Sequence, residues 1–350
     1  MDKNLTEIAN KFAIDGEILN VTPYGEGHIN ATYLVETSGK RYILQRINDY
    51  VFPDVNGLMN NICGVTRYLM DKGVETLSVV YTKTGAPFYK DEKYYRVYDF
   101  IENTVTLQSV TDKKIFKNIG YAFGAFQNQL AGYDAKSLVE VIPHFHDTPK
   151  RYDNFIAALN EDVEERARTC AEEIQFMLDR KDTLSKITSG LQDGSLPLRV
   201  THNDTKINNI LVDAESGKAR AVIDLDTVMA GSMLYDFGDS IRTGAATAKE
   251  DESDLSKVGI DLGLFKAYAE GFCSAVKTSI TAKEKELIPY SVYLMTFEVG
   301  IRFLTDYLAG DVYFHTAYTN HNLVRARNQI KMVKEIEKNM QAMAKIVADL

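Results

Sequence analysis

The stretch Val200-Thr201-His202-Asn203-Asp204-Thr205-Lys206-Ile207-Asn208-Asn209-Ile210-Leu211-Val212 decides the fold of this chain. A short apolar run, residues 198–200, leads into its polar centre, and a second run, residues 210–212, leads out of it. Such runs are typical of strands, with the polar residues forming the loop between them. Asn and Asp also make ordinary turns, so the meaning of this loop depends on the residues that come after it.

The loop contains His-x-Asp, and four residues separate Asp204 from Asn209. In protein-kinase-like enzymes this spacing forms a catalytic loop, in which Asp accepts a hydroxyl proton and Asn holds a metal ion. A predicted hairpin at residues 213–218 and a strand at 219–223 then lead to Asp224. An acid in that position holds Mg²⁺, which prefers hard oxygen ligands. The sequence therefore predicts a phosphotransferase with Asp204 as catalytic base and Asn209 and Asp224 as metal ligands.

A second acidic motif, Asp236-Phe237-Gly238, imitates the metal-binding tripeptide of protein kinases but lies 32 residues after Asp204. We expect no strand to lead into it, and residues 239–242 resemble the start of a helix. We therefore assign the metal to Asp224 and expect Asp236 to hold the catalytic loop in place.

Composition excludes several classes of protein. The 350 residues suffice for two lobes, and 45% of them are hydrophobic. The net charge of −9 and the lack of a basic run argue against nucleic acid as a partner. The three scattered cysteines predict reduced thiols in a cytoplasmic protein. Neither a targeting segment nor an apolar run near membrane-spanning length is evident, so we expect no membrane partner. We also expect a monomer or weak oligomer.

The order of the predicted elements indicates an α+β protein. A short helix, strand-like runs and one interrupting helix come first, at residues 5–12, 17–22, 31–36, 41–46, 54–72, 77–81 and 94–101. Helices dominate afterwards, at residues 113–130, 152–178, 182–191, 262–278, 282–308 and 322–350, with a capping box at Thr281 and Glu284. This order predicts a nucleotide-binding lobe at residues 1–103 and a catalytic lobe at residues 104–350.

The first lobe contains candidate nucleotide contacts. Gly25 and Gly27 would let the backbone approach a phosphate. Taken alone they fit an ordinary glycine hairpin better, but their position ahead of the kinase-like catalytic loop favours the phosphate site. The end of the last strand predicts a hinge, where backbone groups of Ile101 and Asn103 would bond adenine. Lys206 of the catalytic loop would reach the terminal phosphate, or else is a solvated loop residue.

One expected feature is missing from the first lobe. The third strand of a kinase normally carries a Lys that pairs with a Glu of the next helix. Here that strand contains Gln45 and Arg46 instead, and the helix has acids only at its ends, Asp54 and Asp71. Gln45 or Arg46 is expected to substitute, and the alternation of a strand places them on opposite faces.

The motifs Gly25-x-Gly27-His28-Ile29-Asn30, residues 201–209 and residues 223–227 resemble the aminoglycoside phosphotransferase and choline kinase superfamily, and within it the bacterial N-acetylhexosamine 1-kinases. The resemblance extends over nearly the whole chain. It implies a two-lobed protein-kinase-like fold, Mg²⁺, and transfer of the γ-phosphoryl group of ATP to the anomeric C1 hydroxyl of N-acetylglucosamine or N-acetylgalactosamine. The sugar contacts that it implies are His28, Asp204, Thr227, Arg302 and Tyr313.

Several alternatives remain open at this level. Arg302 either binds the sugar or forms a helix salt bridge with Glu298 or Asp306, each four residues away. Another small-molecule kinase of this fold would act on an amino alcohol, a thiosugar or an aminoglycoside. Polycationic substrates would need a strongly acidic pocket mouth, and residues 250–254 either form one or are a solvated loop. The remaining alternative is a nucleotide-binding module without catalysis.

Overall fold

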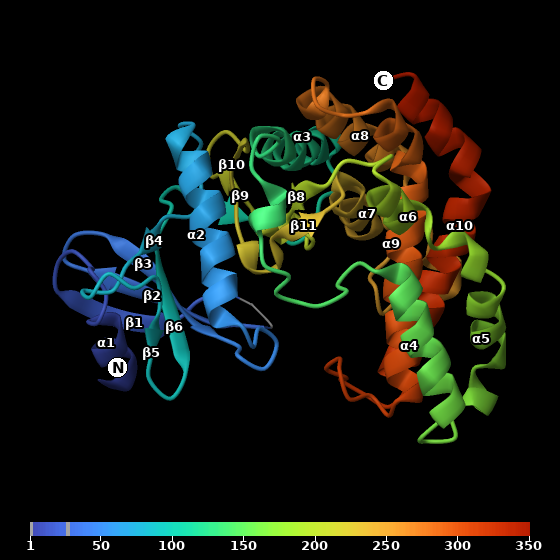
Figure 1. Cartoon of the computed structure of the whole chain (residues 1–350), viewed down its shortest axis with the longest axis horizontal. Helices are drawn as coiled ribbons and strands as arrows, with labels where there is room; N and C mark the ends of the chain where they lie inside the picture. The colour runs from blue at the N-terminus through green and yellow to red at the C-terminus, as the bar shows by residue number, and fades with distance from the viewer. Residues whose placement is uncertain (1–2, 26–28) are drawn as a thin grey trace. The chain divides into compact units, whose positions relative to one another are not determined.

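The computed structural model describes residues 3–25 and 29–350, which form two compact units (Figure 1). Unit 1 contains Met1–Thr106, Gly132–Pro143 and Leu211–Ala230. Unit 2 contains Leu107–Ala131, His144–Ile210 and Gly231–Leu350. Unit 1 is therefore assembled from three separate segments. The division into functional lobes near residue 103 stays a prediction.

Unit 1 is built on an antiparallel sheet with the order β1-β2-β3-β6-β4, and β5 also pairs with β6. The strands are β1 (Ile18–Pro23), β2 (Ala31–Thr37), β3 (Arg41–Ile47), β4 (Val79–Val80), β5 (Tyr89–Lys90) and β6 (Tyr94–Asp99). Apolar side chains of one face, among them Val35, Leu44 and Val97, pack against Ile8 and Phe12 at and after helix α1 (Lys3–Ala9). The alternation of a strand places Gln45 and Arg96 on the opposite face.

Helix α2 (Val55–Asp71) lies beside this sheet (Figure 1). Asp54 caps the helix by accepting the N–H of Gly57. The buried Asn61 donates to the carbonyls of Val139 and Val228, at 2.8 and 3.0 Å. These two bonds attach the second and third segments of unit 1 to α2.

A second sheet in unit 1 has the order β10-β9-β7. Strand β7 (Thr104–Thr106) pairs with β9 (Ile210–Asp213), and β9 is joined to β10 (Ala219–Val222) by the turn at residues 214–218. The predicted hairpin is thus present. Strands β5 and β7 were not predicted, because two or three residues are too few to show an alternating pattern.

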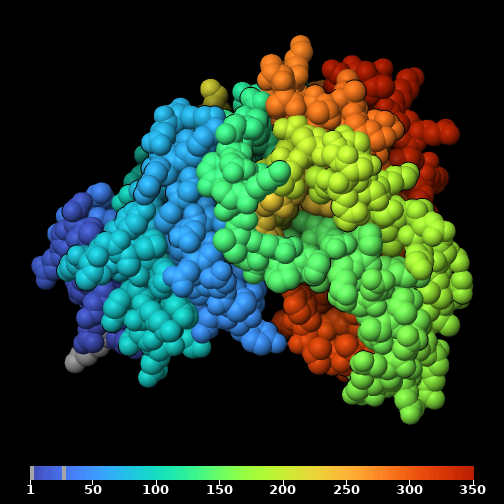
Figure 2. Space-filling model, in the orientation of Figure 1, coloured from blue at the N-terminus to red at the C-terminus, as the bar shows by residue number. Residues whose placement is uncertain are grey.

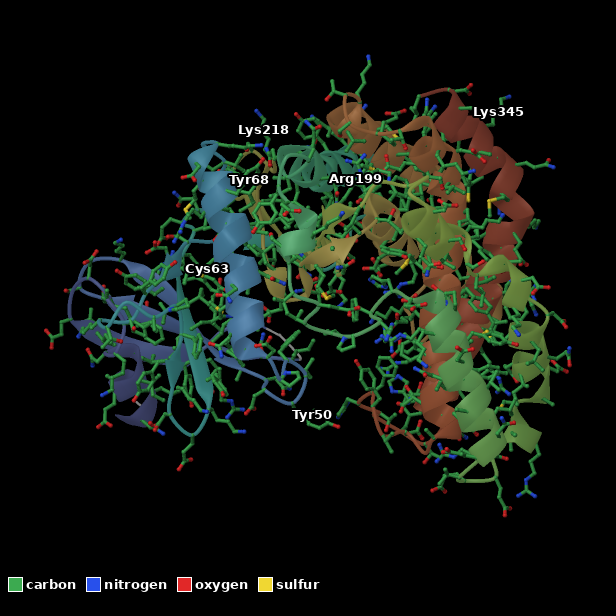
Figure 3. All side chains as sticks on the ribbon, in the orientation of Figure 1. Tyr50, Cys63, Tyr68, Arg199, Lys218 and Lys345 are labelled. Carbon is green, nitrogen blue, oxygen red and sulfur yellow. The ribbon has the colours of Figure 1, made fainter. Side chains whose placement is uncertain are left out.

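Unit 2 is mainly helical. Its helices are α3 (Lys113–Gln129), α4 (Thr148–Glu161), α5 (Ala171–Leu178), α6 (Lys186–Asp193), α7 (Met233–Gly244), α8 (Leu262–Val276), α9 (Ala282–Leu308) and α10 (His321–Ala348). Strand β8 (Arg199–Thr201) also belongs to it, and β11 (Met229–Gly231) ends at its boundary. Helix α4, in green, covers one outer face of the unit (Figure 2). The side chains along these helices, drawn as sticks, fill the spaces between them (Figure 3).

Two predictions about the helices need correction. The single helix expected at residues 152–178 is two helices, because Asp162 adopts a left-handed conformation (φ 37°) and ends α4. Helix α9 is long and apolar enough to span a membrane, contrary to the sequence expectation, but 94% of its apolar window is buried inside the protein. It is therefore a core helix, and its predicted capping box at Thr281 and Glu284 is confirmed.

Candidate active site

The catalytic loop, residues 202–209, is anchored by Asp236. The buried Asp236 carboxylate accepts the backbone N–H groups of His202 and Asn203, at 2.9 and 2.7 Å. Asn203 is held in the left-handed region, at φ 65°. Burial raises the pKa of Asp236, although these bonds and the nearby His202 oppose the rise. The predicted function of Asp236 as the support of the loop is confirmed.

Helix α7 supplies further anchors. Asp239 accepts the N–H of Thr205 at 3.1 Å, and the hydroxyl of Ser240 donates to the Thr205 carbonyl at 3.0 Å. Asp236 lies in the first turn of α7, which Ser232 caps. The short strand β11 does end before this helix, which corrects the expectation that no strand leads there. Asp236 nevertheless points its carboxylate at the loop backbone.

Asp204 lies at the centre of the loop, with 22% of its side chain exposed. Its Oδ1 is 2.8 Å from Nζ of Lys206, and its Oδ2 accepts from Nδ2 of Asn209 at 3.2 Å. Burial would lower the pKa of Lys206, but the Asp204 carboxylate raises that pKa above the ordinary lysine value. The structure therefore brings together three predicted site residues, with a cation beside the carboxylate that would accept the proton.

The predicted Mg²⁺ ligands belong to different units. The buried Asn209 uses its amide nitrogen for both of its bonds to Asp204, so its carbonyl oxygen is the atom it would offer a cation. Asp224 follows β10 closely in a left-handed conformation, at φ 59°, and begins the turn η5 (Leu225–Thr227). Both residues supply hard oxygen, as Mg²⁺ requires. Within residues 3–25 and 29–350, no cluster of three His, Cys, Asp or Glu side chains forms a metal site.

His146 connects the catalytic loop to the core helix α9, and sequence reasoning did not assign it a function. Its Nδ1 lies 2.7 Å from the buried Glu298, and its Nε2 lies 3.2 Å from the Asn203 carbonyl. Thr148 donates to the other oxygen of Glu298 at 2.6 Å. Burial alone would raise the pKa of Glu298, but the charge and hydrogen bond of His146 and the bond from Thr148 lower it below its ordinary value.

Arg302 lies among aromatic rings next to this support. Its guanidinium is 5.6, 5.8 and 5.5 Å from the ring centres of Phe145, Tyr313 and Phe314. Of its two proposed salt-bridge partners, Glu298 bonds to His146 and Thr148 instead. Phe145 also packs on the ring of His146, at 4.5 Å. A continuous series of contacts therefore leads from the catalytic loop to Arg302.

The other proposed partner of Arg302, Asp306, fixes the loop that carries Tyr313. The Asp306 carboxylate accepts the backbone N–H groups of Val312, Tyr313 and Phe314, at 3.0, 2.7 and 2.9 Å. It also accepts from the side chain of Asn322 at 2.8 Å. Tyr313 itself is 63% exposed, so the backbone is held while the ring faces solvent. The contact between Asp306 and this loop could not be predicted from the sequence, because its hydrogen bonds run from backbone N–H groups to the carboxylate.

Unit 1 contains the predicted nucleotide contacts other than Lys206. Gly25 has φ 74° with open space around it, a conformation that favours glycine, whereas Gly27 and His28 lie outside the described residues. At the predicted hinge, the Ile101 carbonyl accepts from the Thr104 hydroxyl, and Asn103 (φ 58°) accepts from the N–H of Ala214. Phe100 stacks under the guanidinium of Arg41 at 4.1 Å. Thr227, a predicted sugar contact, is buried in η5.

The two candidate substitutes for the missing lysine differ in their surroundings. Arg46 is exposed, whereas Gln45 accepts two hydrogen bonds from Arg96 of β6, at 3.0 and 2.8 Å. Arg96 is fully buried and pairs with Asp226 at 2.6 Å. Burial would lower the pKa of Arg96, but Asp226 and neighbouring groups raise it above its ordinary value. Arg96 was not predicted as a functional residue, because an Arg within an aromatic strand does not show which face of the strand is buried.

The chain is similar to known proteins over most of its length. A family model described as "Phosphotransferase enzyme family" matches residues 20–268, more than half of the chain. A microcompartment-associated aminopropanol kinase is similar in structure, with a TM-score of 0.64, 15% identity, and coverage of 97% of this chain and 98% of the other. A choline kinase from Cryptosporidium parvum Iowa II is also similar, with a TM-score of 0.63, 14% identity, and coverage of 100% of this chain and 99% of the other. For a spectinomycin phosphotransferase solved with ADP and spectinomycin, the TM-score is 0.58 and the identity 15%. The match covers 97% of this chain and 98% of the other. The predicted α+β kinase-like fold is confirmed.

Proposed function

Because the chain belongs to the phosphotransferase enzyme family, we propose that it is an ATP-dependent kinase that phosphorylates the anomeric C1 hydroxyl of N-acetylhexosamines. The products are a sugar 1-phosphate and ADP. The proposal joins three supports: the family, the arrangement of the catalytic loop, and the resemblance of the site motifs to N-acetylhexosamine 1-kinases. The ADP bound to the spectinomycin phosphotransferase favours ATP as the phosphoryl donor.

The observation that carries the sugar assignment is the aromatic surround of Arg302. Aromatic rings at Phe145, Tyr313 and Phe314 suit the C–H faces of a pyranose, and a guanidinium donates to hydroxyl and amide oxygens. A second arginine, Arg151, lies close to Arg302. Its pKa is lowered below the ordinary arginine value, mainly by burial and then by the charge of Arg302. Two cations next to each other favour a neutral, oxygen-rich acceptor over a cationic one.

The acidic run at residues 250–254 does not favour the polycationic alternative. Glu250 is bonded to the buried Arg242 at 2.6 Å, and Lys257 contacts Glu252 and Asp254. Asp251 lies 3.6 Å from His321. Glu250, Glu252 and Asp254 therefore have positive partners within unit 2, whereas a pocket for an amino alcohol or an aminoglycoside would present unneutralised carboxylates to the substrate.

Each residue then has a chemical task. Asp204 orients the C1 hydroxyl and accepts its proton, and Lys206 stabilises negative charge beside it. Asn209 and Asp224 would hold Mg²⁺ through their oxygens, and bound Mg²⁺ supplies charge neutralisation at the phosphate oxygens. Phosphoryl transfer proceeds through a loose transition state, so positioning and charge account for most of the catalysis. The anomeric hydroxyl is more acidic than an ordinary alcohol, so an ordinary carboxylate suffices as base.

The product identifies the function directly. A phosphoryl group on the C1 oxygen blocks ring opening, whereas a group on the C6 oxygen does not. Incubation with ATP, Mg²⁺ and N-acetylglucosamine should consume reducing ends in step with ADP release, and phosphorus NMR should show coupling to the anomeric proton. ADP release with all reducing ends retained would place the phosphate elsewhere and refute the proposal.

A substrate panel separates the rival kinases. N-acetylglucosamine, N-acetylgalactosamine, choline, aminopropanol and spectinomycin should be compared at equal concentration, with Asp204→Asn as the inactive control. We expect turnover only with the N-acetylhexosamines. Efficient turnover of a cationic acceptor would support an amino-alcohol or aminoglycoside kinase instead. ATP hydrolysis without phosphorylation of any acceptor in the panel would reject the sugar assignment.

A further inference from the structure

Unit 1 contains a buried polar network whose centre is the Asp226 carboxylate. One oxygen pairs with the guanidinium of Arg96 at 2.6 Å. The other accepts from Nδ2 of Asn30 at 2.5 Å. Arg96 has 1% of its side chain exposed and Asp226 has 5%. A buried ion pair costs much desolvation energy and is weak evidence for stability, so its presence calls for another explanation.

The network extends through three strands. Arg96 of β6 donates from Nε and Nη2 to Oε1 of Gln45 on β3, and Gln45 donates to the hydroxyl of Thr32 on β2 at 3.0 Å. Asn30, just before β2, also accepts the backbone N–H of Asn48 at 2.9 Å. Gln45 thus fixes the orientation of the guanidinium that pairs with Asp226. A lysine at position 96 has no fork of donors and would not be oriented in this way.

The position of Asp226 gives the network its significance. Asp226 lies in the short turn η5, two residues after Asp224, the predicted metal ligand, which immediately precedes this turn. Asn30 ends the segment that follows the glycine loop. The pair therefore holds the turn η5 against the sheet, and Asn30 adds a second bond to Asp226. Gln45 occupies the strand that normally provides the kinase lysine, and the helix that normally provides the partner acid instead contributes Asn61, which bonds the Val228 carbonyl just after η5.

We propose that the Arg96–Asp226 pair, oriented by Gln45, positions Asp224 for metal–nucleotide binding in a unit that lacks the usual Lys–Glu pair. Arg96 and Asp226 are positioning residues, because they are buried and act through η5. The proposal depends on nucleotide binding by this family and not on the identity of the sugar.

Nucleotide binding tests the proposal without any acceptor substrate. ADP should be titrated calorimetrically with Mg²⁺ present and again with excess EDTA, for the parent and for Arg96→Met/Asp226→Asn. The double variant removes both charges together and keeps an acceptor oxygen for Asn30, so no unpaired buried charge remains. We expect the Mg²⁺-dependent gain in ADP affinity to fall by about 10–100-fold, the usual effect of losing a partner that orients a metal ligand. Direct Mn²⁺ binding, followed by electron paramagnetic resonance, should weaken in parallel.

Two more variants keep the test decisive if the double variant folds poorly. Gln45→Leu leaves both charges in place but removes the acceptor that orients Arg96, and Arg96→Lys keeps the charge without the fork. Both should weaken Mg²⁺-dependent ADP binding, with unfolding still cooperative. Arg199→Met is the matched control, because Arg199 forms a comparably buried pair with Glu284. It should lower the melting temperature and leave Mg²⁺-dependent ADP binding unchanged.

Parent-like Mg²⁺–ADP affinity in the folded double variant, or in both Gln45→Leu and Arg96→Lys, would show that the pair is purely structural and overturn the proposal. A protein that binds Mg²⁺–ADP in the expected pattern but phosphorylates no hexosamine would refute the proposed sugar function and leave this inference standing.

Discussion

At the scale of single residues, Asp204 combines partial exposure with two polar neighbours. Lys206 and Asn209 both contact its carboxylate, so the group is held in place. A base held in this way accepts a proton late in a loose transition state, and its main task is orientation.

Asp204→Asn should keep the shape of the loop and lose the base. We expect kcat to fall by about 10²–10⁴-fold, the usual contribution of a general base. The affinity for ADP should stay within about threefold of the parent, because Asp204 would act on the acceptor hydroxyl. Steady-state kinetics and calorimetry measure the two quantities, with the exposed Asp193→Asn as control. A kcat equal to that of the parent would remove Asp204 from the mechanism.

Arg302 tests the acceptor site. Arg302→Ala should raise KM for the sugar by about 10–100-fold, because hydrogen bonds from a charged donor contribute about 1.5–3 kcal/mol each. KM for ATP should change little, since Arg302 contacts the rings of Phe145, Tyr313 and Phe314 in unit 2. Arg327→Ala, which removes an ion pair with Glu173 on the helical surface, is the matched control. An unchanged sugar KM with a lower melting temperature would give Arg302 a structural function only.

At the scale of elements, α7 and η5 carry acids with different tasks. Asp236→Ala leaves two buried loop N–H groups without their acceptor, and each unsatisfied group costs about 1–3 kcal/mol. The variant should therefore melt at a lower temperature. Asp224→Ala should melt near the parent temperature and lose Mg²⁺-dependent turnover. The opposite pattern, with metal dependence lost only in Asp236→Ala, would reverse the assignment of the two acids.

Helix α9 supports the catalytic loop through Glu298, and this support depends on pH. The pKa of Glu298 is lower in the folded protein than its ordinary value. A carboxyl with a depressed folded pKa stabilises the protein above its unfolded pKa, and this stability is lost as the pH falls through the folded pKa. Glu298→Gln should therefore lower the melting temperature at about pH 7, and the difference from the parent should shrink below about pH 4, the ordinary range of glutamate titration. A difference that is independent of pH would show that the charge of Glu298 is not involved.

The same elements show what the sequence can and cannot predict. The catalytic loop, the hairpin and helix α9 were predicted because local spacing, turn residues and a capping box are all short-range signals. Arg96, His146 and Asp306 were missed as functional residues, because their partners lie far away in the sequence or are backbone atoms. The break between α4 and α5 was missed since Asp162 gives no warning that it will adopt a left-handed conformation.

At the scale of the whole molecule, unit 1 is not a continuous stretch of chain. The segments 132–143 and 211–230 belong to it, although the chain passes through unit 2 before each of them. The buried Asn61 depends on the carbonyls of Val139 and Val228, and the buried Arg96 depends on Asp226. These partners all lie beyond residue 106, so the sheet and α2 of residues 3–106 are incomplete without them.

A fragment that ends at residue 106 should therefore not fold by itself, although the sequence predicts a lobe that ends at residue 103. Cutting the chain there leaves a buried guanidinium without its counter-ion, and breaking a buried pair costs about 3–5 kcal/mol, a large part of the stability of a small domain. Circular dichroism and proton–nitrogen NMR of residues 1–106 should show a non-cooperative melt and poor dispersion. Removing the unpaired polar groups with Asn61→Leu and Arg96→Met should restore part of the cooperativity, while Arg67→Met, at a residue that bonds Tyr81 within the fragment, should not. A dispersed spectrum with a sharp melt in the unaltered fragment would show that the strands and α2 are sufficient, and that the two later segments only add to a unit that is already folded.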